Sequence, residues 1–81
     1  MAWYYDCTVE GLWAINETAN VWVMLTQNGQ FFGGVQWRKI APDHFDQVIN
    51  MLTIFNNVKT TKTTCNIRVD GNDFIQEVYG F

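Results

Sequence analysis

A hairpin signal at Asn28-Gly29 constrains this chain more than any other feature of its sequence. The dipeptide favours a two-residue turn because both residues tolerate the positive φ angles that such a turn needs. Apolar runs flank it on both sides within residues 20–40. We therefore predict two paired strands, at about 21–27 and 30–39, with Leu25 opposite Phe32.

Neither face of this predicted hairpin is polar. One face is mainly aliphatic and consists of Val21, Val23, Leu25 and Phe32. The opposite face is bulkier and consists of Trp22, Met24, Phe31, Val35 and Trp37. A single helix covers only one face of a sheet. We expect the aliphatic face to lie under the helix and the aromatic face to bind a partner, because aromatic residues and Met are enriched in interfaces.

The remaining sequence predicts one helix and three further strands. Residues 3–15 alternate like a half-buried strand, with one face made of Trp3, Tyr5, Cys7, Val9, Trp13 and Ile15. Apolar residues recur at spacings of three and four within 42–57, which predicts an amphipathic helix beginning near Pro42. Residues 62–70 and 73–80 predict a closing hairpin.

The predicted element order is β-β-β-α-β-β, and the 81 residues form one domain. This order favours an α+β, two-layer sandwich: an antiparallel sheet of about five strands with one amphipathic helix on one face. The turn at 16–20 leaves the register open. A four-residue loop places Trp13 and Ile15 with the aromatic face, whereas a three-residue loop places them with the aliphatic face.

The titratable residues give no pattern typical of catalysis. His44 is the only histidine and lies beside Asp43 and Asp46. No nucleophile accompanies it in the sequence, so we interpret the group as a solvated helix end whose acids favour the helix dipole. We expect no enzymatic activity, no metal site and no cofactor.

Two further motifs have structural interpretations. The segment 70–73 is too short for a calcium loop and is typical of a hairpin turn. Cys7 and Cys65 form no metal-binding spacing, so we expect two small buried side chains, with a single disulfide as the alternative.

Composition narrows the class of partner. Aromatic residues make up 16% of the chain, the net charge is −3, and the apolar run Val21–Leu25 is far shorter than a membrane span. We expect the few cations to solubilise the sheet, namely Arg38, Lys39, Lys59, Lys62 and Arg68. With so few cations, nucleic acid is a disfavoured partner.

The function predicted from these observations is protein–protein interaction. We expect a cytoplasmic module without an export signal, which pairs with itself as a homodimer or with another protein. The composition is in the style of small accessory or inhibitor proteins of viruses and mobile elements. One alternative is single-stranded nucleic-acid binding on the aromatic face. A second is small-molecule binding between helix and sheet.

Overall fold

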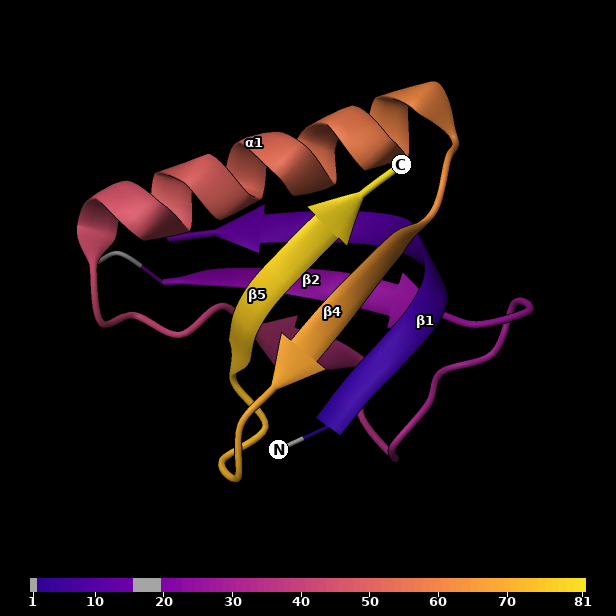
Figure 1. The fold of residues 1–81 in the computed structure, drawn as a ribbon, viewed down its shortest axis with the longest axis horizontal. Coiled ribbons are helices and arrows are strands. Elements are labelled where there is room, and N and C mark those ends of the chain that lie inside the picture. Colours follow the sequence, from indigo (N-terminus) through magenta and orange to yellow (C-terminus); the bar gives the residue numbers. More distant parts are fainter. Residues whose placement is uncertain (1, 16–19) are drawn as a thin grey trace.

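The computed structural model describes residues 2–15 and 20–81. Within them, five strands form one antiparallel sheet that packs against one helix, which confirms the predicted α+β fold (Figure 1). The elements are β1 (Ala2–Ala14), β2 (Val21–Thr26), β3 (Trp37–Lys39), α1 (Phe45–Thr61), β4 (Cys65–Val69) and β5 (Ile75–Gly80).

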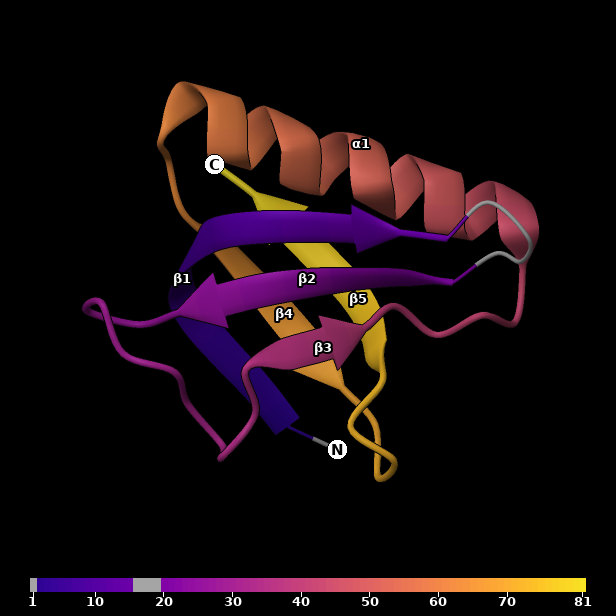
Figure 2. The same ribbon diagram turned by 180° about the vertical axis from the view of Figure 1, so that it is seen from behind.

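The sheet is bent around its central strand. Its order is β3-β2-β1-β4-β5, in which the fourth strand lies beside the first, as in a Greek key. The first half of β1 pairs with β4 and its second half pairs with β2. The β4-β5 and β2-β3 parts therefore lie on opposite sides of the molecule (Figures 1 and 2). A parallel bridge between Ile40 and Ile75 joins the two edges, which makes a partly open, five-stranded barrel.

The helix closes one side of this barrel. Its buried residues Val48, Phe55 and Val58 pack on the inner face of the sheet. The main buried partners from the strands are Cys7, Val9, Val21, Val23, Leu25, Cys65, Ile67, Val69 and Ile75. The single helix and the bent sheet thus share one apolar core.

The helix bounds differ from the predicted 42–57. Pro42 lies in the turn before the helix, and His44 is the N-cap, with an extended backbone. At the other end the helix continues to Thr61, because Val58 extends the apolar stripe into the core. Lys62, in the left-handed conformation, ends the helix with its N–H bonded to the Val58 carbonyl.

The Asn28-Gly29 turn is confirmed. Both residues have positive φ angles, 52° and 78°. Gln27 and Gln30 exchange backbone hydrogen bonds of 2.8 and 3.0 Å across the turn, as a two-residue hairpin loop requires.

The predicted strand 30–39 is wrong over most of its length. Gly33 and Gly34 both adopt left-handed φ angles, so the chain turns again between Phe32 and Val35. Only Trp37–Lys39 pairs with β2, and Met24 faces Trp37. The predicted pairing of Leu25 with Phe32 is therefore wrong, and β2 instead pairs with residues further along the chain, such as Arg38 opposite Val23.

The predicted single face of the first strand is also wrong. The register of β1 shifts between Tyr4 and Cys7, where Asp6 has a φ of 55°, and shifts again between Val9 and Gly11. Each irregularity reverses the alternation of side chains. The residues predicted to share one face are therefore divided between the core (Cys7, Val9) and the surface (Trp3, Tyr5, Trp13).

The closing hairpin is confirmed, with strands shorter than the predicted 62–70 and 73–80. The Asp70 carboxylate organises its turn by accepting hydrogen bonds from the N–H groups of Asn72 and Phe74 and from the Gln76 amide, at 2.7–3.1 Å. These bonds, led by that from Gln76, lower the pKa of Asp70. This carboxylate therefore has a structural role in the turn.

Candidate binding surfaces

Three tryptophans from three strands meet on the outer face of the sheet. Trp13 on β1 lies directly opposite Trp22 on β2, and their rings stack with centroids 4.5 Å apart. Trp37 on β3 meets Trp13 edge-on at 5.8 Å. Met24 lies opposite Trp37 in the β2–β3 pair. We call Trp13, Trp22, Met24 and Trp37 the tryptophan face.

The burial of β2 explains why this face points outward. Val21, Val23 and Leu25 are 5%, 0% and 1% exposed, so the alternating Trp22 and Met24 lie on the outside. This confirms that the aliphatic face of the hairpin lies in the core. The fourth residue predicted for that face, Phe32, is partly buried and also packs against the core.

The structure brings together three of the five predicted site residues. Trp22, Met24 and Trp37 share the tryptophan face, whereas Phe31 and Val35 lie in the irregular segment before β3. The chain first extends beyond the end of β2 and then returns to β3 through this segment (Figure 2).

The predicted site did not include Trp13, which is 48% exposed. Glycine within a strand often marks a bulge, so Gly11 was the available signal. A β-carbon on Gly11 would lie 3.2 Å from the Trp37 ring, so this glycine also makes room for Trp37.

The N–H of Ile15 donates to the Asn20 carbonyl, as in the four-residue loop alternative, although residues 16–19 lie outside the described part of the chain.

Lys39 brings positive charge to this surface. Its Nζ atom lies 5.6 Å from the centroid of the Trp22 ring and 5.6 Å from that of Phe74. Such a position over an aromatic ring is a weak cation–π contact. The edge of the tryptophan face therefore carries a cation.

The prediction that Arg38 is a solubilising surface residue is wrong. Its side chain is 1% exposed and forms an ion pair with Asp73. Its guanidinium donates to the Phe32 carbonyl at 2.7 Å and lies over the rings of Tyr4 and Phe32 at 5.0 and 4.6 Å. Gly33 adjoins it so closely that a β-carbon there would lie 2.5 Å from Arg38 Nη2. Arg38 thus joins three separate segments from inside the molecule.

A second aromatic cluster lies on the outer face of β1, β4 and β5. Trp3 and Tyr5 stack with centroids 6.3 Å apart, and Tyr79 and Phe81 lie 5.2 Å apart. Together with Asn66 these four residues line a shallow hollow of about 310 Å³. The irregularity at Asp6 explains why Trp3 and Tyr5, predicted to lie with the buried Cys7, are on the surface instead.

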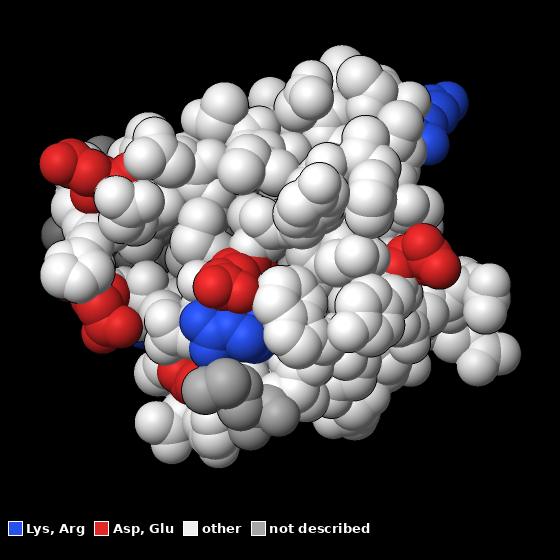
Figure 3. Space-filling view, in the orientation of Figure 1, with Lys and Arg blue, Asp and Glu red and all other residues white. Residues whose placement is uncertain are grey.

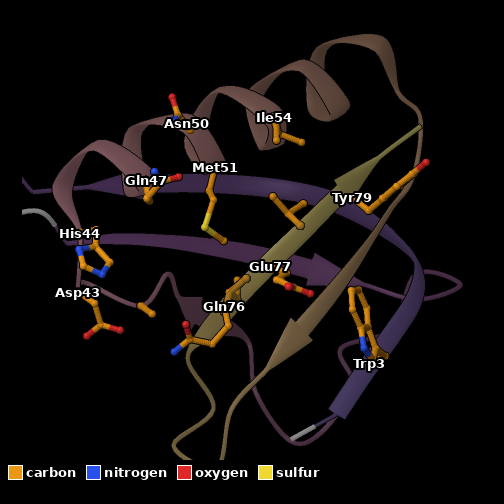
Figure 4. A pocket seen from close by; sticks show the side chains of 13 residues that line it. Trp3, Asp43, His44, Gln47, Asn50, Met51, Ile54, Gln76, Glu77 and Tyr79 are labelled. Carbon is orange, nitrogen blue, oxygen red and sulfur yellow. The ribbon is translucent and has the colours of Figure 1, made fainter.

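A groove of about 550 Å³ runs between α1 and β5 (Figure 4). Gln47, Asn50, Met51 and Ile54 form its helix side, and Gln76–Tyr79 form its strand side. This groove lies in the region of the site predicted between helix and sheet, and binding of a small molecule there stays a prediction. In the view of Figure 3, carboxylates gather at the end of the molecule where α1 begins.

His44 and its neighbours form no interacting pair. Its backbone carbonyl accepts the first helical hydrogen bonds, from Gln47 and Val48, and its side chain makes no capping bond. Within residues 2–15 and 20–81, no ion pair joins His44 to Asp43 or Asp46. No group of three potential metal ligands occurs in that part of the chain.

The two cysteines are buried and unbonded, as predicted. They lie opposite each other in the β1–β4 pair. Burial raises the pKa of Cys7 to about 11 and that of Cys65 to about 12. Because the thiolate is the reactive form, these thiols are poor nucleophiles near neutral pH.

Comparison with known proteins identifies no relative: no protein-family model, curated protein or solved structure matches this chain. In the described residues, no helix is long and apolar enough to span a membrane. The surfaces described above are therefore the basis for a functional proposal.

Proposed function

We propose that this protein is a non-enzymatic interaction module that forms a homodimer through the tryptophan face. The observation that carries the proposal is the stacked group of Trp13, Trp22 and Trp37 on an outer sheet face. Exposed aromatic patches on small domains usually mark interaction sites. Tryptophan is also the residue most enriched among those that dominate binding energy.

The geometry suits a self-complementary contact. A twofold interface uses the same patch on both copies, so Trp13 would be buried in each copy and every contact would occur twice in the dimer. Covering the exposed half of one tryptophan removes on the order of 100 Å² of apolar surface, worth about 2–3 kcal/mol. Stacking has already fixed the rings, so little side-chain entropy is lost on association.

Sedimentation velocity over a range of concentrations tests this proposal. We expect the native protein to dimerise and Trp13→Asp to remain monomeric with an unchanged circular dichroism spectrum. Phe31→Asp is the matched control, because Phe31 is also 48% exposed but follows the end of β2, whereas Trp13 pairs with Trp22 near its start. Dimerisation that survives Trp13→Asp, or that is lost equally in Phe31→Asp, would contradict the proposal.

A second candidate function is single-stranded nucleic-acid binding on the same face. Five-stranded, partly open Greek-key barrels of the OB type bind oligonucleotides or oligosaccharides on the face of their second and third strands. The present chain has this strand arrangement, with Trp22 and Trp37 on those strands and Lys39 beside them. Aromatic rings beside cations are typical of surfaces on which bases stack.

The charge distribution favours the first candidate. Of the few cations, Arg38 is buried and Arg68 is paired with Glu77 at 3.0 Å.

Tryptophan fluorescence in a titration with oligodeoxythymidylate separates the two functions. Quenching that weakens with salt supports nucleic-acid binding, whereas unchanged fluorescence at low salt removes this candidate.

A further inference from the structure

The free edge of β5 carries a second inference, which is independent of the tryptophan face. β5 is the last strand in the sheet order and pairs on one side with β4. On its other side, among the described residues, a single bridge joins Ile75 to Ile40, and the Ala41 N–H donates to the Ile75 carbonyl at 2.9 Å. The chain itself thus pairs with the start of this edge and then turns away to α1.

Unpaired backbone groups continue along the edge beyond this bridge. Phe81 donates to the Thr64 carbonyl at 3.2 Å, so these two residues form a hydrogen-bonded pair. Hydrogen-bonded and non-hydrogen-bonded pairs alternate in antiparallel strands. The N–H and C=O groups of Val78 and Gly80 therefore point away from β4, toward the free edge. In the described residues, no further strand pairs with them.

The groove between α1 and β5 follows this edge. Its volume of about 550 Å³ lies between β5 and the helix residues Gln47, Asn50 and Met51 (Figure 4). The edge from Gln76 to Gly80 is about 13 Å long at 3.3 Å per residue. An extended segment of about five residues matches this length.

The lining of the groove also indicates the chemistry of its occupant. Asp43 and Glu77 contribute carboxylates, and no Lys or Arg lines the groove. Glu77 is paired with Arg68, whereas Asp43 has no ion pair among the described residues. Met51 and Ile54 supply an apolar wall from the helix. A strand laid here turns alternate side chains toward this wall and toward solvent.

We propose that this groove binds an extended basic peptide, which adds a strand to β5 with alternating apolar and cationic side chains. Strand addition at a sheet edge obtains affinity from main-chain hydrogen bonds and specificity from alternate side chains. The Ile40–Ile75 bridge is a single parallel pairing at the start of this edge, and the proposed peptide would continue the pairing beyond it.

Fluorescence anisotropy with a labelled peptide of six alternating lysines and valines tests the proposal. Two further probes carry N-methyl groups on alternate residues, at odd or at even positions, and a fourth replaces lysine by glutamate. We expect the unmodified peptide to bind, the glutamate peptide to bind at least tenfold more weakly, and one of the N-methylated peptides to do the same. Absence of binding, or equal binding by both N-methylated peptides and the unmodified one, would overturn the proposal.

Two helix variants locate the peptide. Asn50→Trp fills the groove, while Asn56→Trp places the same side chain on the same helix outside the groove lining. We expect at least tenfold weaker binding for Asn50→Trp and less than a twofold change for Asn56→Trp. Amide exchange at Val78 is expected to slow at least tenfold with the peptide bound. Equal effects of the two variants, or unchanged exchange at Val78, would contradict strand addition.

Trp13→Asp separates this site from the proposed dimer contact. It is expected to abolish dimerisation while changing the affinity for the lysine–valine peptide less than twofold. Loss of peptide binding in Trp13→Asp would place the peptide on the tryptophan face and overturn the inference about β5.

Discussion

Replacing Arg38 by methionine is expected to reduce the free energy of unfolding by about 3 kcal/mol. Removing one member of a buried ion pair costs about 3–5 kcal/mol, largely because the other charge is left uncompensated. Here the remaining charge is Asp73, whose side chain is 41% exposed and can be hydrated, so the lower end of that range applies. The cation–π contacts with Tyr4 and Phe32 add about 0.5–1 kcal/mol each. The methionine side chain keeps much of the apolar contact that the Arg38 side chain makes, and this contact offsets part of the loss from the ion pair and the cation–π contacts.

Urea unfolding followed by tryptophan fluorescence measures the effect. We expect a lower midpoint with an unchanged slope, and a melting temperature lower by roughly 10–25 °C for a domain of this size. Arg68→Met is the matched control, because the Arg68–Glu77 pair lies at the surface and is worth about 1 kcal/mol or less. A loss below 1 kcal/mol in Arg38→Met, or equal losses in both variants, would refute the internal role assigned to Arg38.

Two further predictions concern the interior. Gly33→Ala is expected to destabilise the fold by about 1–2 kcal/mol in urea unfolding, because the φ angle of Gly33 is +65° and the added β-carbon would meet Arg38. Gly71→Ala is the control and is expected to be nearly neutral, because no atom lies within contact distance of its β-carbon. Equal losses of stability in the two variants would contradict the close approach of Gly33 to Arg38. The raised pKa values of Cys7 and Cys65 make the free energy of unfolding depend on pH: their contribution is full below pH 9 and is lost as the pH rises toward about 11 and 12, because thiols exposed by unfolding ionise near 9. Replacing both cysteines by alanine is expected to flatten the alkaline part of a plot of unfolding free energy against pH. An unchanged alkaline decline in the double variant would contradict the burial of these thiols.

The sequence predicted the elements of this fold better than their faces. Asn28-Gly29 and the apolar spacing of the helix are local signals, and both predict structure that is observed. The two irregularities of β1 are different, because each depends on pairing with two separate partner strands. Asp6, a non-glycine residue at positive φ, gives almost no signal in the sequence. The faces of Trp3, Tyr5 and Trp13 could therefore not be obtained from alternation alone.

The candidate site shows the same limit. Trp22 and Met24 could be assigned to the outer face because β2 is regular, and its alternation held. The prediction for Phe31 and Val35 rests on a hairpin that continues through Gly33-Gly34, where the backbone turns instead. Arg38 was assigned to the surface by residue type, since burial of a cation requires partners distant in sequence, here Asp73 and the Tyr4 ring.

The central claim is that the tryptophan face is a contact surface, and ¹⁹F NMR of protein labelled with 5-fluorotryptophan tests it most directly. The chain contains four tryptophans, and Trp3, which belongs to the second aromatic cluster with Tyr5, is an internal reference. On dilution, we predict that the signals of Trp13, Trp22 and Trp37 shift together with one midpoint while that of Trp3 stays constant. Constant signals from all four residues, or a shift confined to Trp3, would contradict the claim.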